Sequence, residues 1–417
     1  MLLVLAPDHH TLLNDAFGLR QLVYTVGVKK GWYASDPALL ADLLNLKPDP
    51  EAEKFLQLIK IGMGMREYYF PGDVTRYAEV KHLQANHFLD LKEHSHHRFF
   101  PCDPIEEQPL EDVAHRAATM LRNIVEGAHE RFPLALALTA GMDSRLVLAA
   151  TKSISQNVLY YTIAHPLRMK DQAVPSSDPD IKIAARLCAK LGLSHQVVPA
   201  RAVIDGTEFS KLLAQHTSMP HRFFGEGAQG LLQEFRERRV ALTGSCSETA
   251  RLKWYRKANL DTVTADKIAD LYGWGLGNEA FVRRTIDEWL ATAKPRCEAT
   301  GFQLLDLFYW EYKMGRWLAQ ALIEQDLAQE TLCPFDCREL ITTMMATQWK
   351  DRSFYTNFRL QRAMLAELWP ECLSEAWKTD PKVKKIKSGM KAHLRVKIFG
   401  KGYPTSFLRT LHRSWSI

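Results

Sequence analysis

The segment Leu134-Ala-Leu-Ala-Leu-Thr-Ala-Gly-Met-Asp-Ser-Arg-Leu-Val-Leu-Ala-Ala150 decides the fold of this chain. An apolar run ends in a turn of small residues, and a second apolar run with helical spacing follows at once, so the segment predicts a strand, a loop and a helix. The small side chains of Thr139, Ala140 and Gly141 let backbone N–H groups approach a polyphosphate at the positive end of a helix that begins near Ser144. The segment therefore predicts a phosphate-binding loop.

The same loop offers polar side chains to a phosphate and its counter-ion. Thr139 and Ser144 supply hydroxyl donors, and Asp143 supplies a carboxylate of the kind that binds Mg²⁺ between phosphates. An ordinary tight turn between a buried strand and a helix uses similar small residues, so the loop alone leaves both interpretations open.

Composition indicates a globular protein. The chain has 417 residues, 46% of them apolar, which is enough for two or three domains with sizeable cores. No apolar run approaches the roughly 20 residues that a membrane helix needs, so we expect a cytoplasmic protein without membrane contact. The seven cysteines are scattered without CxxC spacing, which favours reduced thiols over a disulfide framework or a zinc site.

The net charge of +6 is concentrated at the C-terminal end. Residues 378–417 contain eleven Lys and Arg residues and one acidic residue, Asp380. Such a basic tail can contact nucleic acid or another polyanion. Apolar residues interleave with the charges, so the tail can equally pack over the predicted phosphate loop. Both interpretations remain open.

The first 105 residues and the rest of the chain carry different patterns. Short strand-like runs between turn signals predict a small β-rich domain up to about residue 105. From residue 106, strand-like and helix-like runs alternate, which predicts an α/β domain with a parallel sheet, helices on both faces and ligands beyond the carboxyl ends of the strands. The expected strands lie at residues 22–27, 32–34, 87–91, 134–138, 157–164, 196–198 and 239–244, and the expected helices at residues 110–131, 144–150 and 180–191.

The loop at residues 139–144 resembles the Ser-Gly-Gly-x-Asp-Ser loop of the PP-loop ATP pyrophosphatases. This group includes asparagine synthetase, β-lactam synthetase, lasso-peptide cyclases and lysidine synthase, which cut ATP between its α and β phosphates. In this chain Ala140 replaces the second glycine and adds a methyl group at the point of closest backbone approach. A negative φ at Ala140 would accommodate that methyl group.

The N-terminal region carries a second resemblance. Residues 14–24, 33–40 and 71–89 look like the later strands of the class II glutaminase domain that precedes the synthetase domain in asparagine synthetase. That domain uses its own N-terminal cysteine as nucleophile, whereas this chain begins Met1-Leu2-Leu3. The resemblance implies a truncated, inactive glutaminase-like domain at residues 1–105, followed by an asparagine synthetase-like PP-loop domain at residues 106–417.

Two further segments look like parts of the synthetase domain. Residues 243–251 resemble its second glycine-rich loop, where Glu248 would join Asp143 on Mg²⁺ and Arg251 would contact a phosphate or a substrate carboxylate. Helix capping by Ser245 or Ser247 is the simpler alternative. Asp178 and Asp180 fit the family's acidic residue before a helix, and Asp178 can equally be a helix cap.

The C-terminal third carries a third resemblance. Residues 309–317 and 332–340 look like the helix and the turn that press against the ATP loop in asparagine synthetase, and Asp336 is expected to fix that turn. The aromatic set Tyr309, Trp310, Tyr312 and Trp317 has helical spacing and predicts core packing.

The resemblance implies a set of site residues. It implies that Mg²⁺ is bound by Asp143 and Glu248, and that catalytic cations come from Arg316 and from one of Lys384, Lys385 and Lys387 in the tail. The implied ATP-binding residues are Leu138, Thr139, Ala140, Gly141, Asp143, Ser144, Tyr161, Thr162, Gly244, Arg251 and Lys313.

The resemblance implies an ATP-dependent amide ligase that forms AMP and pyrophosphate. Its substrates would be a small-molecule or peptide carboxylate and an amine or ammonia, with ATP and Mg²⁺ as cofactors and without glutaminase activity. Two alternatives remain. One is a PP-loop enzyme that modifies a nucleic acid base, with residues 378–417 gripping the polyanion. The other is a catalytically silent nucleotide-binding or scaffold protein, which the alanine at position 140 and the altered second loop favour.

Overall fold

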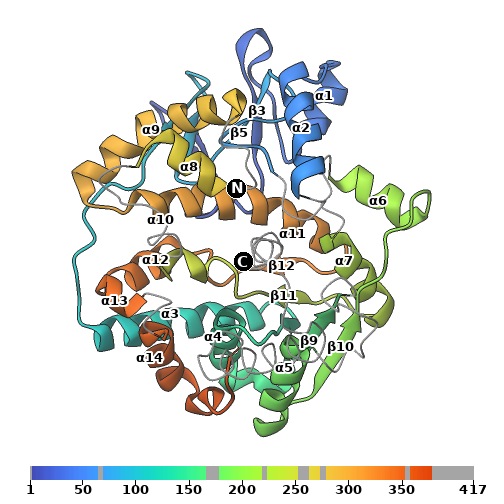
Figure 1. The fold of residues 1–417 in the computed structure, drawn as a ribbon, viewed down its shortest axis with the longest axis vertical. Coiled ribbons are helices and arrows are strands. Elements are labelled where there is room, and N and C mark those ends of the chain that lie inside the picture. Colours follow the sequence, from blue (N-terminus) through green and yellow to red (C-terminus); the bar gives the residue numbers. More distant parts are fainter. Residues whose placement is uncertain are drawn as a thin grey trace, which may run out of the picture.

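A parallel five-stranded sheet forms the centre of the C-terminal part of the molecule. The structure is a computed structural model (Figure 1) and describes residues 2–63, 69–165, 178–217, 223–251, 263–272, 279–352 and 357–377. The strand order is β10-β9-β8-β11-β12, and every neighbouring pair is parallel. The strands are β8 (Leu134–Ala137), β9 (Leu159–Ala164), β10 (His195–Pro199), β11 (Val240–Leu242) and β12 (Thr331–Leu332).

Helices cover both faces of this sheet, which confirms the predicted α/β class. On one face, α14 (Arg359–Leu368) packs against α3 (Leu110–His129) and α4 (Met142–Ala150), and α3 turns a stripe of buried apolar residues to the core. On the other face, α7 (Phe223–Glu234) packs against β10 and α11 (Ala319–Asp326). The α4 helix begins two residues before the predicted start near Ser144, and β12 lies in a segment whose sequence predicts a turn.

The described N-terminal region holds two small antiparallel sheets, and it also contains the helices α1 and α2, which the sequence interpretation did not predict. One has the order β1-β2-β6-β7 and the other β4-β3-β5. The predicted strands at residues 22–27, 32–34 and 87–91 correspond to β3, β4 and β6. These elements are β1 (Leu2–Leu5), β2 (His10–Leu13), β3 (Val23–Thr25), β4 (Tyr33–Ala34), α1 (Pro37–Leu44), α2 (Pro50–Met63), β5 (Val80–His82), β6 (His87–Asp90) and β7 (Ser95–Arg98).

A row of helices joins the two regions. Figure 1 shows α10 (Leu304–Phe308) and α11 between the N-terminal strands and the parallel sheet. They are connected by a π-helix over Tyr309–Leu318, which we call the π segment. Its Trp310 ring stacks on Phe17 with 4.5 Å between centroids, so both regions share one hydrophobic core. The predicted domain boundary near residue 105 stays a prediction.

The remaining elements surround these layers. Among the described residues, no helix combines the length and the apolar character that crossing a membrane requires. The other helices are α5 (Pro179–Lys190), α6 (Glu208–His216), α8 (Ala265–Tyr272), α9 (Ala280–Thr300), α12 (Arg338–Met345) and α13 (Trp349–Arg352), and the short 3₁₀ turns are Gly27–Lys29, Lys152–Asn157, Ser247–Arg251 and Pro370–Leu373.

Candidate functional site

Two loops meet at the carboxyl edge of the parallel sheet. The first loop, residues 138–144, follows β8, and the second loop, residues 243–251, follows β11. These two strands are neighbours, and the chain leaves them in opposite directions, toward β9 and β10 on one side and toward β12 on the other. In open parallel sheets, ligands bind at such a reversal of strand order. The topology therefore places both predicted loops where a ligand is expected.

Gly244 brings the second loop onto the first turn of α4. A Cβ atom at this position would lie 2.4 Å from the carbonyl carbon of Asp143 and 2.4 Å from the nitrogen of Ser144. Backbone atoms cannot move aside as a side chain can, so only glycine fits here. The close approach of the two loops therefore explains why this position of the second loop is a glycine.

The N–H groups of the first loop have acceptors within the protein. Thr139 donates to the Ser144 hydroxyl at 3.1 Å, and Gly141 donates to the Thr139 hydroxyl at 3.2 Å. Ala140 donates to a carboxylate oxygen of Asp180 at 3.1 Å. A carboxylate therefore occupies a place where a phosphate oxygen was expected. Ala140 is fully buried and does not have a positive φ, so its methyl group is accommodated.

The N-terminus of α4 has no side-chain cap. Its N-cap residue, Gly141, has extended backbone and no side chain with which to accept from the first turn. By contrast, Asp178 caps α5 by accepting from Asp180 at 2.8 Å, which confirms the simpler interpretation of that residue. An uncapped N-terminus presents N–H donors and the positive end of the helix dipole to an anion.

An ion pair links the two loops. Arg251 Nη2 donates to Asp143 Oδ2 at 2.9 Å, and the Ser247 hydroxyl donates to Asp143 Oδ1. Burial lowers the pKa of Arg251, but the carboxylates of Asp143 and Glu248 outweigh that effect and the pKa is raised. Glu248 therefore acts electrostatically on the same guanidinium, which stays protonated.

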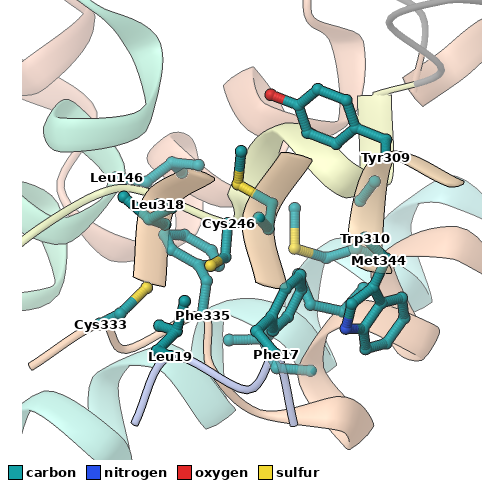
Figure 2. Packing of buried hydrophobic residues seen from close by; sticks show 14 of the residues in the cluster. Phe17, Leu19, Leu146, Cys246, Tyr309, Trp310, Leu318, Cys333, Phe335 and Met344 are labelled. Carbon is teal, nitrogen blue, oxygen red and sulfur yellow. The ribbon is translucent and has the colours of Figure 1, made fainter. Parts of the chain in front are cut away.

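Tyr309, which the sequence interpretation assigned to the core, lies close enough to the charged residues of the two loops to be affected by them. Its ring is buried, as predicted, and Figure 2 shows its hydroxyl pointing away from the labelled apolar side chains. Burial raises the pKa of Tyr309 well above its ordinary value, Glu248 raises it further, and Arg251 opposes the shift. Tyr309 also begins the π segment, and π-helical turns occur frequently at functional sites.

Residues predicted at the end of the second strand position the first loop. Leu138 donates its N–H to the carbonyl of Tyr161 at 2.8 Å, and the Thr162 hydroxyl donates to the carbonyl of Leu138 at 2.6 Å. The Tyr161 ring packs against the Phe235 ring. These residues extend the sheet from β8 into the loop.

The two cations predicted on residues 309–317 contact the N-terminal region and an aromatic ring. Arg316 donates to the carbonyls of Phe70 at 3.4 Å and Val74 at 2.8 Å and so ties the π segment to the N-terminal region. The Lys313 ammonium lies 4.2 Å from the Trp317 ring centroid. None of these contacts is with the two loops, and the phosphate roles of Arg316 and Lys313 stay predictions. Lys384, Lys385 and Lys387 lie outside the described residues.

The Asp143 carboxylate, one of the two predicted Mg²⁺ ligands, already has partners within the protein. Both oxygens of the Asp143 carboxylate accept hydrogen bonds, one from Arg251 and one from Ser247. Within the part of the chain that the structure describes, no group of three or more His, Cys, Asp or Glu side chains is arranged to hold a metal ion. Arg251 pairs with the carboxylate to which the sequence assigned the metal.

Comparisons with known proteins do not assign this chain to a family. No protein-family model and no curated protein matches the chain. One solved structure that aligns is the NH3-dependent NAD synthetase from Campylobacter jejuni in complex with the nitrate ion. The alignment covers 49% of this chain and 96% of that chain, with 15% sequence identity and a TM-score of 0.22. A TM-score this low assigns neither a fold nor a function.

Proposed function

We propose that this chain binds ATP between the two loops and uses it to activate a carboxylate for amide formation. The observation that carries the proposal is the meeting of two loops from neighbouring strands at the uncapped N-terminus of α4. The resemblance of residues 139–144 to the PP-loop supports ATP as the ligand. The same resemblance supports cleavage between the α and β phosphates, and therefore an AMP-forming reaction.

The proposed reaction has two steps. An oxygen of the substrate carboxylate attacks the α-phosphorus of ATP, the bond from that phosphorus to the bridging oxygen breaks, and pyrophosphate leaves with the electron pair. An amine or ammonia then attacks the acyl carbon, AMP leaves, and the nitrogen loses a proton. The N–H groups of the first turn of α4 and the Arg251 guanidinium would stabilise negative charge on the departing pyrophosphate.

The nitrogen donor in this proposal is an amine or ammonia. The first cysteine in the sequence is Cys102, and its thiol is exposed. A hydrogen bond with Asp103 raises the pKa of Cys102, whereas a nucleophilic thiol needs a lowered pKa. The described N-terminal strands therefore offer no activated thiol for glutamine hydrolysis.

Substitutions of Gly141 test the ATP site. Its extended backbone suits an Asp cap, so Gly141→Asp should preserve or stabilise α4 while placing a carboxylate where the phosphate would bind. We expect calorimetric titration to show ATP binding by the wild type and at least about tenfold weaker binding by Gly141→Asp. The matched variant Gly141→Ser introduces a neutral cap and should weaken ATP binding less than Gly141→Asp does. Absence of ATP binding by the wild type, or wild-type affinity in Gly141→Asp, would overturn the proposal.

Pyrophosphate release tests the chemistry once binding is established. Carboxylates are screened with ATP and an amine, and the reaction should give pyrophosphate and AMP in equal amounts. Glutamine as the sole nitrogen source should give no product. Release of ADP and phosphate would contradict the proposed adenylation.

A silent nucleotide-free scaffold is the second candidate, and one observation favours it. The N–H groups of Thr139, Ala140 and Gly141 already have acceptors within the protein, one of them the Asp180 carboxylate. A phosphate must replace these acceptors to use the donors. Modification of a nucleic acid base depends on residues 378–417, which lie outside the described residues, and stays a prediction.

A further inference from the structure

Arg251 pairs with one of the two carboxylates to which the sequence assigned a metal ion. Asp143 and Glu248 were expected to share Mg²⁺, but Arg251 forms an ion pair with Asp143 at 2.9 Å, and Glu248 acts electrostatically on the same guanidinium. A guanidinium beside two carboxylates offsets negative charge as a metal ion does. It also donates hydrogen bonds in a planar fork that matches phosphate oxygens.

The surroundings of Arg251 hold the side chain in place. The guanidinium carbon lies 5.6 Å from the centroid of the Phe358 ring, and Phe358 is buried. Phe358 and the preceding Asn357 have φ values of 57° and 65°, a left-handed conformation that costs free energy in residues with side chains. Two successive residues in this conformation turn the start of α14 and place the ring against Arg251.

A buried ion pair contacts the backbone of the second loop next to Arg251. Arg352 Nη1 lies 3.3 Å from Asp306 Oδ2 and 3.5 Å from the carbonyl oxygen of Ala250, the residue before Arg251. Burial raises the pKa of Asp306 to about 6, and Arg352 opposes that shift. Arg251 is thus a supported part of the site.

The Arg251 guanidinium has donors beyond the one that binds Asp143. Nη2 donates to Asp143, whereas Nε is buried and has no acceptor among the described residues. The side chain is 14% exposed. We infer that the Arg251 guanidinium is the resident cation of this site and that it allows a phosphate or pyrophosphate group to bind without a divalent cation. This inference rests on the proposed ATP site and specifies how that site neutralises charge.

Titration of inorganic pyrophosphate with and without a chelator tests the inference. In EDTA, the wild type should bind pyrophosphate, with a Kd within about tenfold of that measured in Mg²⁺. Arg251→Gln should weaken binding in EDTA by at least about tenfold, because one charge-assisted contact is lost. Arg251→Lys, which keeps the charge, should weaken it less. The matched control Arg284→Gln removes an exposed arginine that pairs with Glu51 outside the site, and it should leave binding in EDTA unchanged.

The outcomes separate this inference from the proposed function. Pyrophosphate binding by the wild type that disappears in EDTA overturns the resident cation and leaves the ATP site standing. Arg251→Gln that binds as the wild type does in EDTA also overturns it. Absence of binding in both buffers overturns the inference and the ATP site together. The wild-type comparison does not depend on any variant, so it can overturn the inference even where Arg251→Gln fails to fold.

Discussion

Two arginine–carboxylate pairs of this molecule are built differently. Arg98 and Glu311 join the N-terminal sheets to the π segment, and their side chains are 4% and 0% exposed. Glu311 accepts from both terminal nitrogens of Arg98, from Asn86 at 3.1 Å and from Trp289 at 2.6 Å. Four donors on two oxygens leave that carboxylate fully satisfied.

The pair in the candidate site is open by comparison. Asp143 and Arg251 are 23% and 14% exposed, and Asp143 accepts one bond from Arg251 and one from Ser247. Arg251 Nε has no acceptor among the described residues. The difference indicates that the first pair fixes the junction of two regions, whereas the second can exchange partners with a ligand.

The largest expected effect comes from breaking the closed pair. Arg98→Gln leaves the Glu311 charge buried without its cation, so we expect a loss of about 3–5 kcal/mol in the free energy of unfolding. Urea denaturation measures it. The control is Arg284→Gln, which breaks an exposed pair with Glu51 and should cost less than about 1 kcal/mol. Similar losses in both variants would contradict a special role for the buried pair.

The second prediction concerns the contact between the two loops. Gly244→Ala forces a methyl group against the backbone of Asp143 and Ser144, so we expect a loss of about 1–3 kcal/mol from overpacking. Thermal unfolding measures it. The control, Gly127→Ala, adds a methyl group in open space on α3 and should be neutral or stabilising. An unchanged stability of Gly244→Ala would show that the two loops are not in contact.

A third buried carboxyl group differs from both pairs because another carboxyl group, Asp15, acts on it. Burial and the neighbouring Asp15 raise the pKa of Asp336 from 3.8 to about 8, against the Phe17 N–H group and Arg338, which favour the charged form. The folded state then holds a proton that the unfolded state releases above about pH 4. Stability should fall as pH rises through this window and level off above about pH 8.

Urea denaturation at several pH values measures this slope, which is at most about 1.4 kcal/mol per pH unit for one proton. Asp336→Asn keeps the size of the side chain and removes its titration, so its unfolding free energy should change less between pH 6 and pH 8. An equal slope in Asp336→Asn and the wild type would show that Asp336 is not the titrating group.

Local patterns in the sequence predicted much of the fold. The apolar runs before Thr139 and Thr243 and the spacing in residues 110–131 depend on neighbours in the chain, and all three correspond to β8, β11 and α3. The two-residue strand β12 was missed, because its assignment comes from pairing with β11 and not from its own composition. Pairing partners far apart in sequence leave little local signal.

The charged residues of the site also have partners far apart in the sequence, which local patterns do not reveal. Arg251 pairs with Asp143 across 108 positions of the chain, and Asp180 reaches the Ala140 N–H group across 40. The sequence placed Asp143 and Arg251 near the carboxyl edge of the sheet and Asp180 before a helix, but did not determine which groups pair. Arg316 has the residue type expected for a phosphate contact, yet it binds the carbonyls of Phe70 and Val74.

The smallest expected effect comes from breaking the open pair. Arg251→Gln leaves Asp143 with the Ser247 hydroxyl and access to water, so it should lower the free energy of unfolding by only about 1 kcal/mol. The same substitution at Arg98 is the matched comparison, and urea denaturation of the two variants side by side should separate them by at least about 2 kcal/mol. Equal losses would contradict an exchangeable pair, because a guanidinium that the fold depends on for stability is not available to a ligand.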